Sequence, residues 1–111
     1  MSSTTRPLDE LEATIRQRAE NPSESSYTSK LLSGGAAAIG QKVIEEAGEL
    51  VEAAFEPGDD GRSHFIFEAA DLMYHTLVLL RSHGVELAEV EAELARRFGT
   101  SGLEEKASRN N

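Results

Sequence analysis

Apolar residues recur every three or four positions along most of this chain, and no segment alternates apolar and polar residues as a strand would. The pattern begins directly after Pro7, a residue that favours the first turn of a helix. It predicts an all-α chain with helices over residues 7–20, 36–55, 64–83 and 87–98.

Proline, glycine and asparagine mark the ends of these segments. Residues 57–61, Pro-Gly-Asp-Asp-Gly, are the strongest turn signal and predict that the second and third helices form an antiparallel hairpin. Gly84 is expected to cap the third helix, which is apolar on most of its circumference and should be the most buried element. Residues 23–28 are predicted to be a loop, with at most one helical turn at residues 30–32.

The length of 111 residues allows one domain, predicted over residues 1–99 with a polar tail over residues 100–111. Hydrophobic residues make up 39% of the chain, enough for one core but with little to spare. We therefore expect an antiparallel helical bundle that is completed by dimerisation.

Composition also excludes several classes of function. The absence of cysteine excludes disulfides, thiolate metal sites and a cysteine nucleophile. A net charge of −9 argues against a nucleic-acid partner. Residues 1–6 are polar and no apolar run approaches the roughly 20 residues that span a bilayer, so a cytoplasmic protein without a membrane partner is expected.

The second helix places acids at the edge of its apolar face. Glu46 falls on the border of that face with Lys42 and Glu49 beside it, whereas Glu45 and Glu52 project further out. At about 100° per residue, the core face is predicted to consist of Ile39, Val43, Ala47, Leu50 and Ala54.

The third helix carries a polar stripe of Glu68, Asp71, His75 and Ser82 on a largely apolar surface. Because buried carboxylates need compensation, the predicted hairpin should bring Glu68 and Asp71 opposite the acids of the second helix. Two like charges 4 Å apart repel by about 4 kcal/mol at an effective dielectric constant near 20.

Divalent cations would relieve this repulsion. Oxygen-only ligands favour Mg²⁺, with Mn²⁺ as a substitute, and Mg²⁺ commonly accepts substrate phosphates as further ligands. The acids therefore predict metal-assisted phosphate chemistry, in which an activated water attacks phosphorus and pyrophosphate leaves.

Two motifs carry a family resemblance. Residues 42–49, Lys-Val-Ile-Glu-Glu-Ala-Gly-Glu, and residues 68–75, Glu-Ala-Ala-Asp-Leu-Met-Tyr-His, resemble phosphoribosyl-ATP pyrophosphohydrolases, within the wider MazG-like group of all-α nucleotide pyrophosphohydrolases. The similarity continues in residues 26–32 and in residues 83–99, and covers roughly residues 8–99.

The resemblance implies hydrolysis of phosphoribosyl-ATP to phosphoribosyl-AMP and pyrophosphate in histidine biosynthesis, by a magnesium-dependent homo-oligomer. By position, it implies that an auxiliary acid, Glu45, acts beside Glu46 in catalysis. The metal ligands that it implies are Glu46, Glu49, Glu68 and Asp71.

Other polar residues are candidates for binding substrate. Lys42 either contacts a phosphate or forms a salt bridge with Glu46 or Glu49. His75 either acts on metal or substrate or is a hydrogen-bonded structural residue, and Lys30 and Tyr27 are candidates for nucleotide contacts.

Three alternatives stay open from sequence. A related MazG-type enzyme would hydrolyse another (d)NTP with the same metal motif. A di-iron carboxylate bundle normally has Glu-x-x-His on two helices, whereas Glu68 is followed at the third position by Asp71. A non-enzymatic interaction module would carry these acids as a solvated surface.

Overall fold

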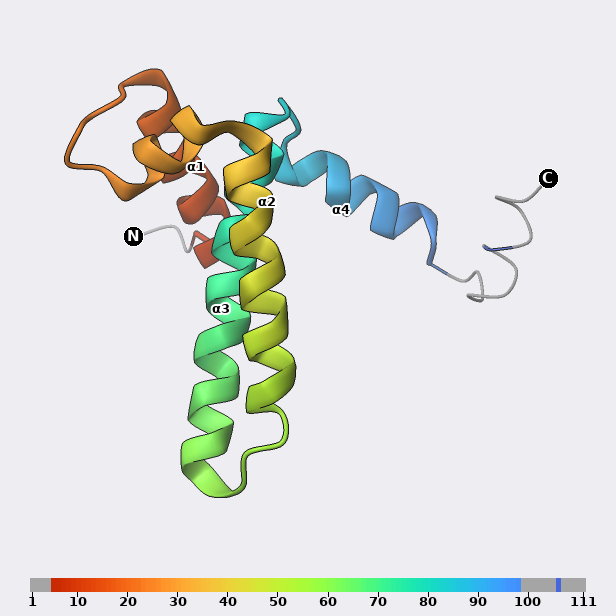
Figure 1. Cartoon of the computed structure of the whole chain (residues 1–111). Helices are drawn as coiled ribbons and strands as arrows, with labels where there is room; N and C mark the ends of the chain where they lie inside the picture. Colours follow the sequence, from red (N-terminus) through yellow and green to blue (C-terminus); the bar gives the residue numbers. More distant parts are fainter. Residues whose placement is uncertain (1–4, 99–105, 107–111) are drawn as a thin grey trace.

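The computed structural model describes residues 5–98 and Lys106. This part of the chain contains helices and no strand, which confirms the all-α prediction (Figure 1). The predicted end of the fourth helix at Gly99 and the predicted tail lie outside the described residues, apart from Lys106. The helices are α1 (Pro7–Glu20), α2 (Tyr27–Ala53), α3 (Gly58–Ser82) and α4 (Leu87–Arg96).

The long helices α2 and α3 run antiparallel as the predicted hairpin, and α4 leads away from it (Figure 1). The hairpin has two ends. We call residues 27–39 and 74–82 the core end, because α1 and Leu87 pack there on one apolar cluster. We call residues 40–53 and 58–73 the loop end. The buried members of the cluster are Ile15, Leu31, Ile39, Leu77, Val78 and Leu87.

Helix α2 begins earlier than predicted, because Ser26 caps it. The Ser26 hydroxyl accepts a hydrogen bond from the amide of Ser29 at 3.1 Å, which satisfies one of the free donors of the first turn. The helix is then interrupted at Gly35, whose φ of 75° and ψ of −175° are not helical. The prediction that residues 27–28 are a loop is therefore wrong, whereas the predicted helix over residues 36–55 begins directly after this interruption.

Helix α3 also begins early, at Gly58 instead of His64. Pro57 is extended, so the reversal is complete before residue 58. Asp59 and Asp60 then lie in the first turn, where the positive end of the helix dipole favours acids. At the other end, the predicted cap is confirmed, because Gly84 has a φ of 72° and Val85 donates to the Leu80 carbonyl at 2.9 Å.

The buried line of α2 is rotated from the predicted core face. Ile39, Glu46 and Ala53 are buried, whereas Ala54 is exposed, so α2 faces α3 with an acid near the middle of its contact surface. Helix α3 is not buried along its length in one chain, because Phe65, Ile66, Phe67 and Met73 are exposed at the loop end. None of the described helices is long and apolar enough to cross a membrane.

Candidate metal centre

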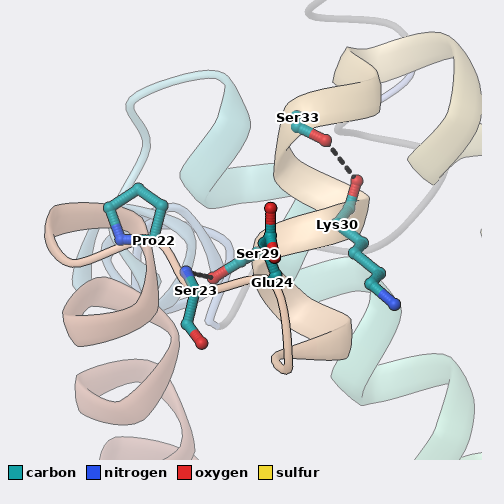
Figure 2. A pocket seen from close by; sticks show the side chains of 6 residues that line it. All are labelled: Pro22, Ser23, Glu24, Ser29, Lys30 and Ser33. Carbon is teal, nitrogen blue, oxygen red and sulfur yellow. Dashed lines mark hydrogen bonds between the residues drawn. The ribbon is translucent and has the colours of Figure 1, made fainter.

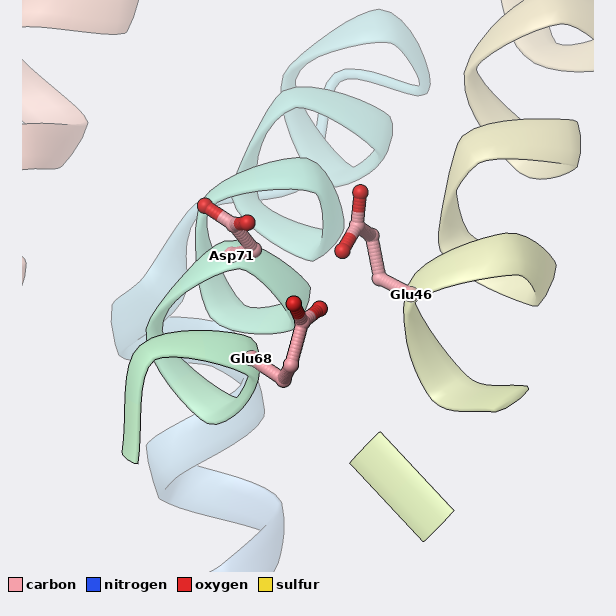
Figure 3. Close-up of side chains that lie close together, drawn as sticks. All are labelled: Glu46, Glu68 and Asp71. Carbon is pink, nitrogen blue, oxygen red and sulfur yellow. The ribbon is translucent and has the colours of Figure 1, made fainter. Parts of the chain in front are cut away.

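Three carboxylates meet between α2 and α3. Glu46 comes from α2, and Glu68 and Asp71 come from successive turns of α3 (Figure 3). One oxygen from each side chain lies within 4.8 Å of the others. Glu46 is 9% exposed and Glu68 is 5% exposed, while Asp71 is half-buried. The hairpin therefore brings together three of the four predicted ligands.

The fourth predicted ligand, Glu49, is exposed and stands beside this group. It lies close enough to Glu68 to act on its pKa by hydrogen bonding and by charge. Glu45 is exposed and pairs with Lys42 at 3.6 Å. The prediction that Lys42 pairs with Glu46 or Glu49 is therefore wrong, because its ammonium group reaches the outer acid at i+3 instead.

Burial and crowding change the protonation of Glu68. Its pKa is raised to about 7, first by desolvation, then by hydrogen bonds from its protonated form to Glu49 and Glu46, and last by the charges of these two acids. One oxygen of Glu46 and one of Glu68 are buried without any hydrogen-bond partner. Two buried acceptors are thus available for a cation or a proton.

His64 is a member of this site that sequence analysis missed. Its Nε2 lies 3.2 Å from Glu68 Oε1, and its Nδ1 lies 2.9 Å from Glu56 Oε1. Hydrogen bonding to Glu56 is the largest cause that raises the His64 pKa. Because carboxylates only accept, both ring nitrogens donate when the imidazole is charged. The i, i+4 spacing from Glu68 was a usable signal, but residue 64 was predicted to start the helix and Glu56 to lie in a loop.

His75 lies one turn beyond Asp71 and is 5% exposed. Its Nδ1 is 3.0 Å from the backbone carbonyl oxygen of Asp71, and its Nε2 is 3.1 Å from the hydroxyl of Tyr27. Both ring nitrogens are thus engaged by the protein. The imidazole has no free nitrogen for a metal ion in this arrangement.

Lys30 lies on the far side of the Gly35 break from the acids of α2. It is exposed and lines an open groove of about 660 Å³ (Figure 2). The other residues of the groove are Pro22, Ser23, Glu24, Ser29 and Ser33, and none of the metal-site acids lines it.

The donor set decides which chemistry this centre supports. Carboxylate oxygens from two helices suit a hard divalent cation that keeps some of its waters. Among the described residues, no lysine or arginine pairs with Glu46, Glu68 or Asp71, and His64 pairs with Glu68 as a cation when its imidazole is protonated. A di-iron centre would need histidine at the third position after a ligand glutamate on two helices, and α3 has Asp71 there.

Comparison with known proteins shows to which family the sequence is similar. A family model described as phosphoribosyl-ATP pyrophosphohydrolase matches residues 8–98. The phosphoribosyl-ATP pyrophosphatase of Rhodopirellula baltica is 62% identical over 103 residues, which cover 93% of this chain and 86% of that protein. Phosphoribosyl-ATP pyrophosphatase 1 of Rhodopseudomonas palustris is 54% identical over 102 residues, 92% of each chain. The phosphoribosyl-ATP pyrophosphatase of Neisseria meningitidis serogroup C is 48% identical over 103 residues, also 92% of each chain.

Proposed function

Because this chain belongs to the phosphoribosyl-ATP pyrophosphohydrolase family, we propose that it hydrolyses phosphoribosyl-ATP to phosphoribosyl-AMP and pyrophosphate, as a step of histidine biosynthesis in the cytoplasm. The family match and the names of the relatives support the substrate. One structural observation supports the chemistry, namely the convergence of Glu46, Glu68 and Asp71 between two helices.

The three acids fit a magnesium ion. The buried oxygens of Glu46 and Glu68 that lack hydrogen-bond partners are suitable ligands, with Asp71 as a third and Glu49 at the exposed side as a fourth. Bound there, Mg²⁺ or Mn²⁺ would supply positive charge that stabilises the leaving pyrophosphate. Without a cation, desolvation and the neighbouring acids favour a proton on Glu68, whose pKa is about 7.

Hydrolysis needs a base for the attacking water. A carboxylate accepts a proton from the water, the water oxygen bonds to the α-phosphorus, and the bond from this phosphorus to the oxygen shared with the β-phosphorus breaks, so that pyrophosphate leaves. Glu46 is buried beside the other acids, and Glu45 is exposed one position earlier. These two residues are the candidates for that base.

Two lysines are proposed to contact the substrate. Lys42 lies one turn before Glu46, and its ammonium group pairs with Glu45 at 3.6 Å. Lys30 stands at the edge of the open groove with no ion pair among the described residues. A point charge at either position attracts phosphate oxygens. His75 acts on substrate binding indirectly, through its hydrogen bond to Tyr27.

We also propose that a second copy of the chain covers the loop end. Ile44 is 74% exposed on α2, and Ile66 and Met73 are more than half exposed on α3. Val51, Phe65 and Phe67 of the two helices and Phe55 of their connection are also exposed, and roughly 200 Å² per aromatic side chain implies about 370 Å² from the phenylalanines alone. Soluble monomers rarely leave such surfaces open.

The decisive test is pyrophosphate release from phosphoribosyl-ATP, measured with and without Mg²⁺. We expect turnover with Mg²⁺, weaker turnover with Mn²⁺, and none after chelation. Canonical dNTPs serve as matched substrates, because a related dNTP pyrophosphatase would share the metal motif. A preference for dNTPs would contradict the proposed substrate. Turnover in excess chelator would contradict the proposed dependence on a metal ion. If neither substrate is hydrolysed, the result would favour the alternative of a non-enzymatic interaction module.

A further inference from the structure

The first part of α2, residues 27–34, is set apart from the part that carries the acids. Gly35 interrupts the helix with a φ of 75° and a ψ of −175°. A continuous helix would fix the direction of residues 27–34 through its backbone hydrogen bonds, but this break removes that constraint. Contacts with the rest of the chain must therefore hold the segment in place.

Two hydrogen bonds join the segment to α3. The hydroxyl of Tyr27 lies 3.1 Å from His75 Nε2, and the hydroxyls of Thr28 and Tyr74 bond to each other. The rings also contact one another, with 6.0 Å between the centroids of Tyr27 and His75 and 4.9 Å between those of Tyr74 and His75. Thr28 and His75 are buried, whereas Tyr27 is 50% exposed.

The direction of the first bond follows from the other nitrogen of His75. Nδ1 lies 3.0 Å from the carbonyl oxygen of Asp71, which can only accept, so Nδ1 carries the hydrogen. In the neutral ring, Nε2 is then the acceptor and Tyr27 donates. An unbroken path of hydrogen bonds thus runs from Tyr27 through His75 to the backbone of Asp71, a predicted metal ligand.

We propose that Tyr27 is a positioning residue for this reaction. Its bond to His75 latches residues 27–34 onto α3, and so fixes the place of Lys30 relative to the acids. The idea rests on the proposed function, because it assigns the groove beside Lys30 to a part of the substrate remote from the reacting bond. Interactions with such parts assist a reaction only when their distance from the reacting centre is held.

Substitutions can separate the two bonds of His75. Tyr27→Phe removes one hydroxyl and keeps the ring. His75→Asn keeps a donor for the Asp71 carbonyl and loses the acceptor for Tyr27, whereas His75→Gln can offer an acceptor near the position of Nε2. Thr76→Val is the matched control, because it removes an exposed hydroxyl of α3 that bonds only to the Leu72 carbonyl.

We expect Tyr27→Phe and His75→Asn each to raise KM for phosphoribosyl-ATP roughly 10-fold, the loss of about one hydrogen bond, while kcat changes less than about 2-fold. The double variant should lose no more than either single variant, because both remove the same bond. His75→Gln should recover most of the KM, and Thr76→Val should match the parent. Additive losses, or a loss confined to kcat, would overturn the proposal.

Hydrogen exchange gives a readout that needs no activity. Tyr27→Phe should speed amide exchange at residues 27–34 several-fold and leave residues 40–53 unchanged, because only the latched segment is released. If the parent does not hydrolyse phosphoribosyl-ATP, the proposed function fails, yet exchange still decides whether the latch exists. Unchanged amide exchange in Tyr27→Phe would contradict the proposal that the Tyr27–His75 hydrogen bond holds residues 27–34 on α3, even in an active enzyme.

Discussion

The two ends of the α2–α3 hairpin differ in the kind of side chain that they bury. At the core end, Ile39 and Val78 are fully buried against Ile15 of α1, and ion pairs such as Arg16 with Glu86 lie at the surface. At the loop end, the buried side chains include Glu46 and Glu68, and the large apolar side chains are exposed. The same helix pair therefore buries apolar side chains at one end and acidic side chains at the other.

The difference indicates what each end is for. Burial of apolar side chains stabilises the core end, at about 1.5–3 kcal/mol for each large residue. Burial of Glu46 and Glu68, with which no lysine or arginine of the described residues pairs, opposes folding. Exposed apolar surface contributes little within one chain. The loop end thus carries the features for which a metal ion and a second chain are proposed.

The largest expected effect comes from removing a charge at the loop end. Asp71→Asn should lower turnover of phosphoribosyl-ATP at least about 100-fold, as losses of electrostatic stabilisation usually do. Glu49→Gln, which removes the charge of the exposed predicted ligand, should do the same. Without metal, the unfolding midpoint of Asp71→Asn should stay equal or rise, because repulsion among the acids falls. Steady-state kinetics and thermal unfolding measure both.

The matched substitution at the core end should reverse this pattern. Ile39→Ala is expected to lower the free energy of unfolding by about 2–5 kcal/mol, while kcat per folded molecule stays near that of the parent. Full activity in both acid variants would end the metal hypothesis. Loss of activity without loss of stability in Ile39→Ala would erase the distinction between the two ends.

A smaller effect should follow when the apolar surface of the loop end receives a charge. Met73→Glu should shift the chain from dimer to monomer in sedimentation velocity, because a carboxylate would be buried in the interface. Ala13→Glu, which adds the same charge at an exposed position of α1, is the control. A parent that sediments as a monomer at high concentration would show that no second copy covers this surface.

The smallest effect concerns pH. Glu68 has an ordinary pKa of 4.5 and a folded-state pKa of about 7, so between these values the folded chain holds a proton that the unfolded chain has released. This contribution to stability is present below about pH 4.5 and is lost as the pH rises through about 7. The pKa of His64 is also raised, mainly by Glu56, and changes stability in the same direction.

The metal-free chain should therefore unfold at a lower temperature at about pH 8 than at about pH 5.5, and Mg²⁺ should stabilise it more at the higher pH. Glu68→Gln should reduce the difference in unfolding temperature between the two pH values. The same measurement on His64→Gln gives the contribution of His64 to this difference. Thermal unfolding at the two values checks it. A Glu68→Gln profile identical to that of the parent would contradict the assignment.

The parts of the fold that depend on periodicity could be predicted from the sequence. The hairpin, the first helix and the cap at Gly84 follow from apolar spacing and from the conformations that proline and glycine allow. The starts of α2 and α3 were missed, although Ser26 and the acids at residues 59–60 are ordinary signals of a helix start. In both cases the loop before the helix was predicted to be longer than it is, because turn-forming residues lie near the helix start.

The candidate site was predicted less completely, because helical wheels place apolar residues inward. Glu46 lies within the α2–α3 contact instead of at its border, and Ile44 on the other side of α2 is exposed. A helical-wheel projection does not distinguish a helix face that is buried within its own chain from one that a second chain is proposed to cover. His64 was missed for another reason, since its link to Glu56 exists only after the chain has reversed.

The short connection between α2 and α3 also has a consequence for the order of folding. Glu46 and Glu68 are separated by 22 positions, whereas the amide of Leu87 reaches Glu12 across 75. Closing the longer loop costs about 1 kcal/mol more in chain entropy. Contacts of low sequence separation also form faster than distant ones. The acids that would bind the metal can therefore assemble as a local unit before α1 and the start of α4 close the core.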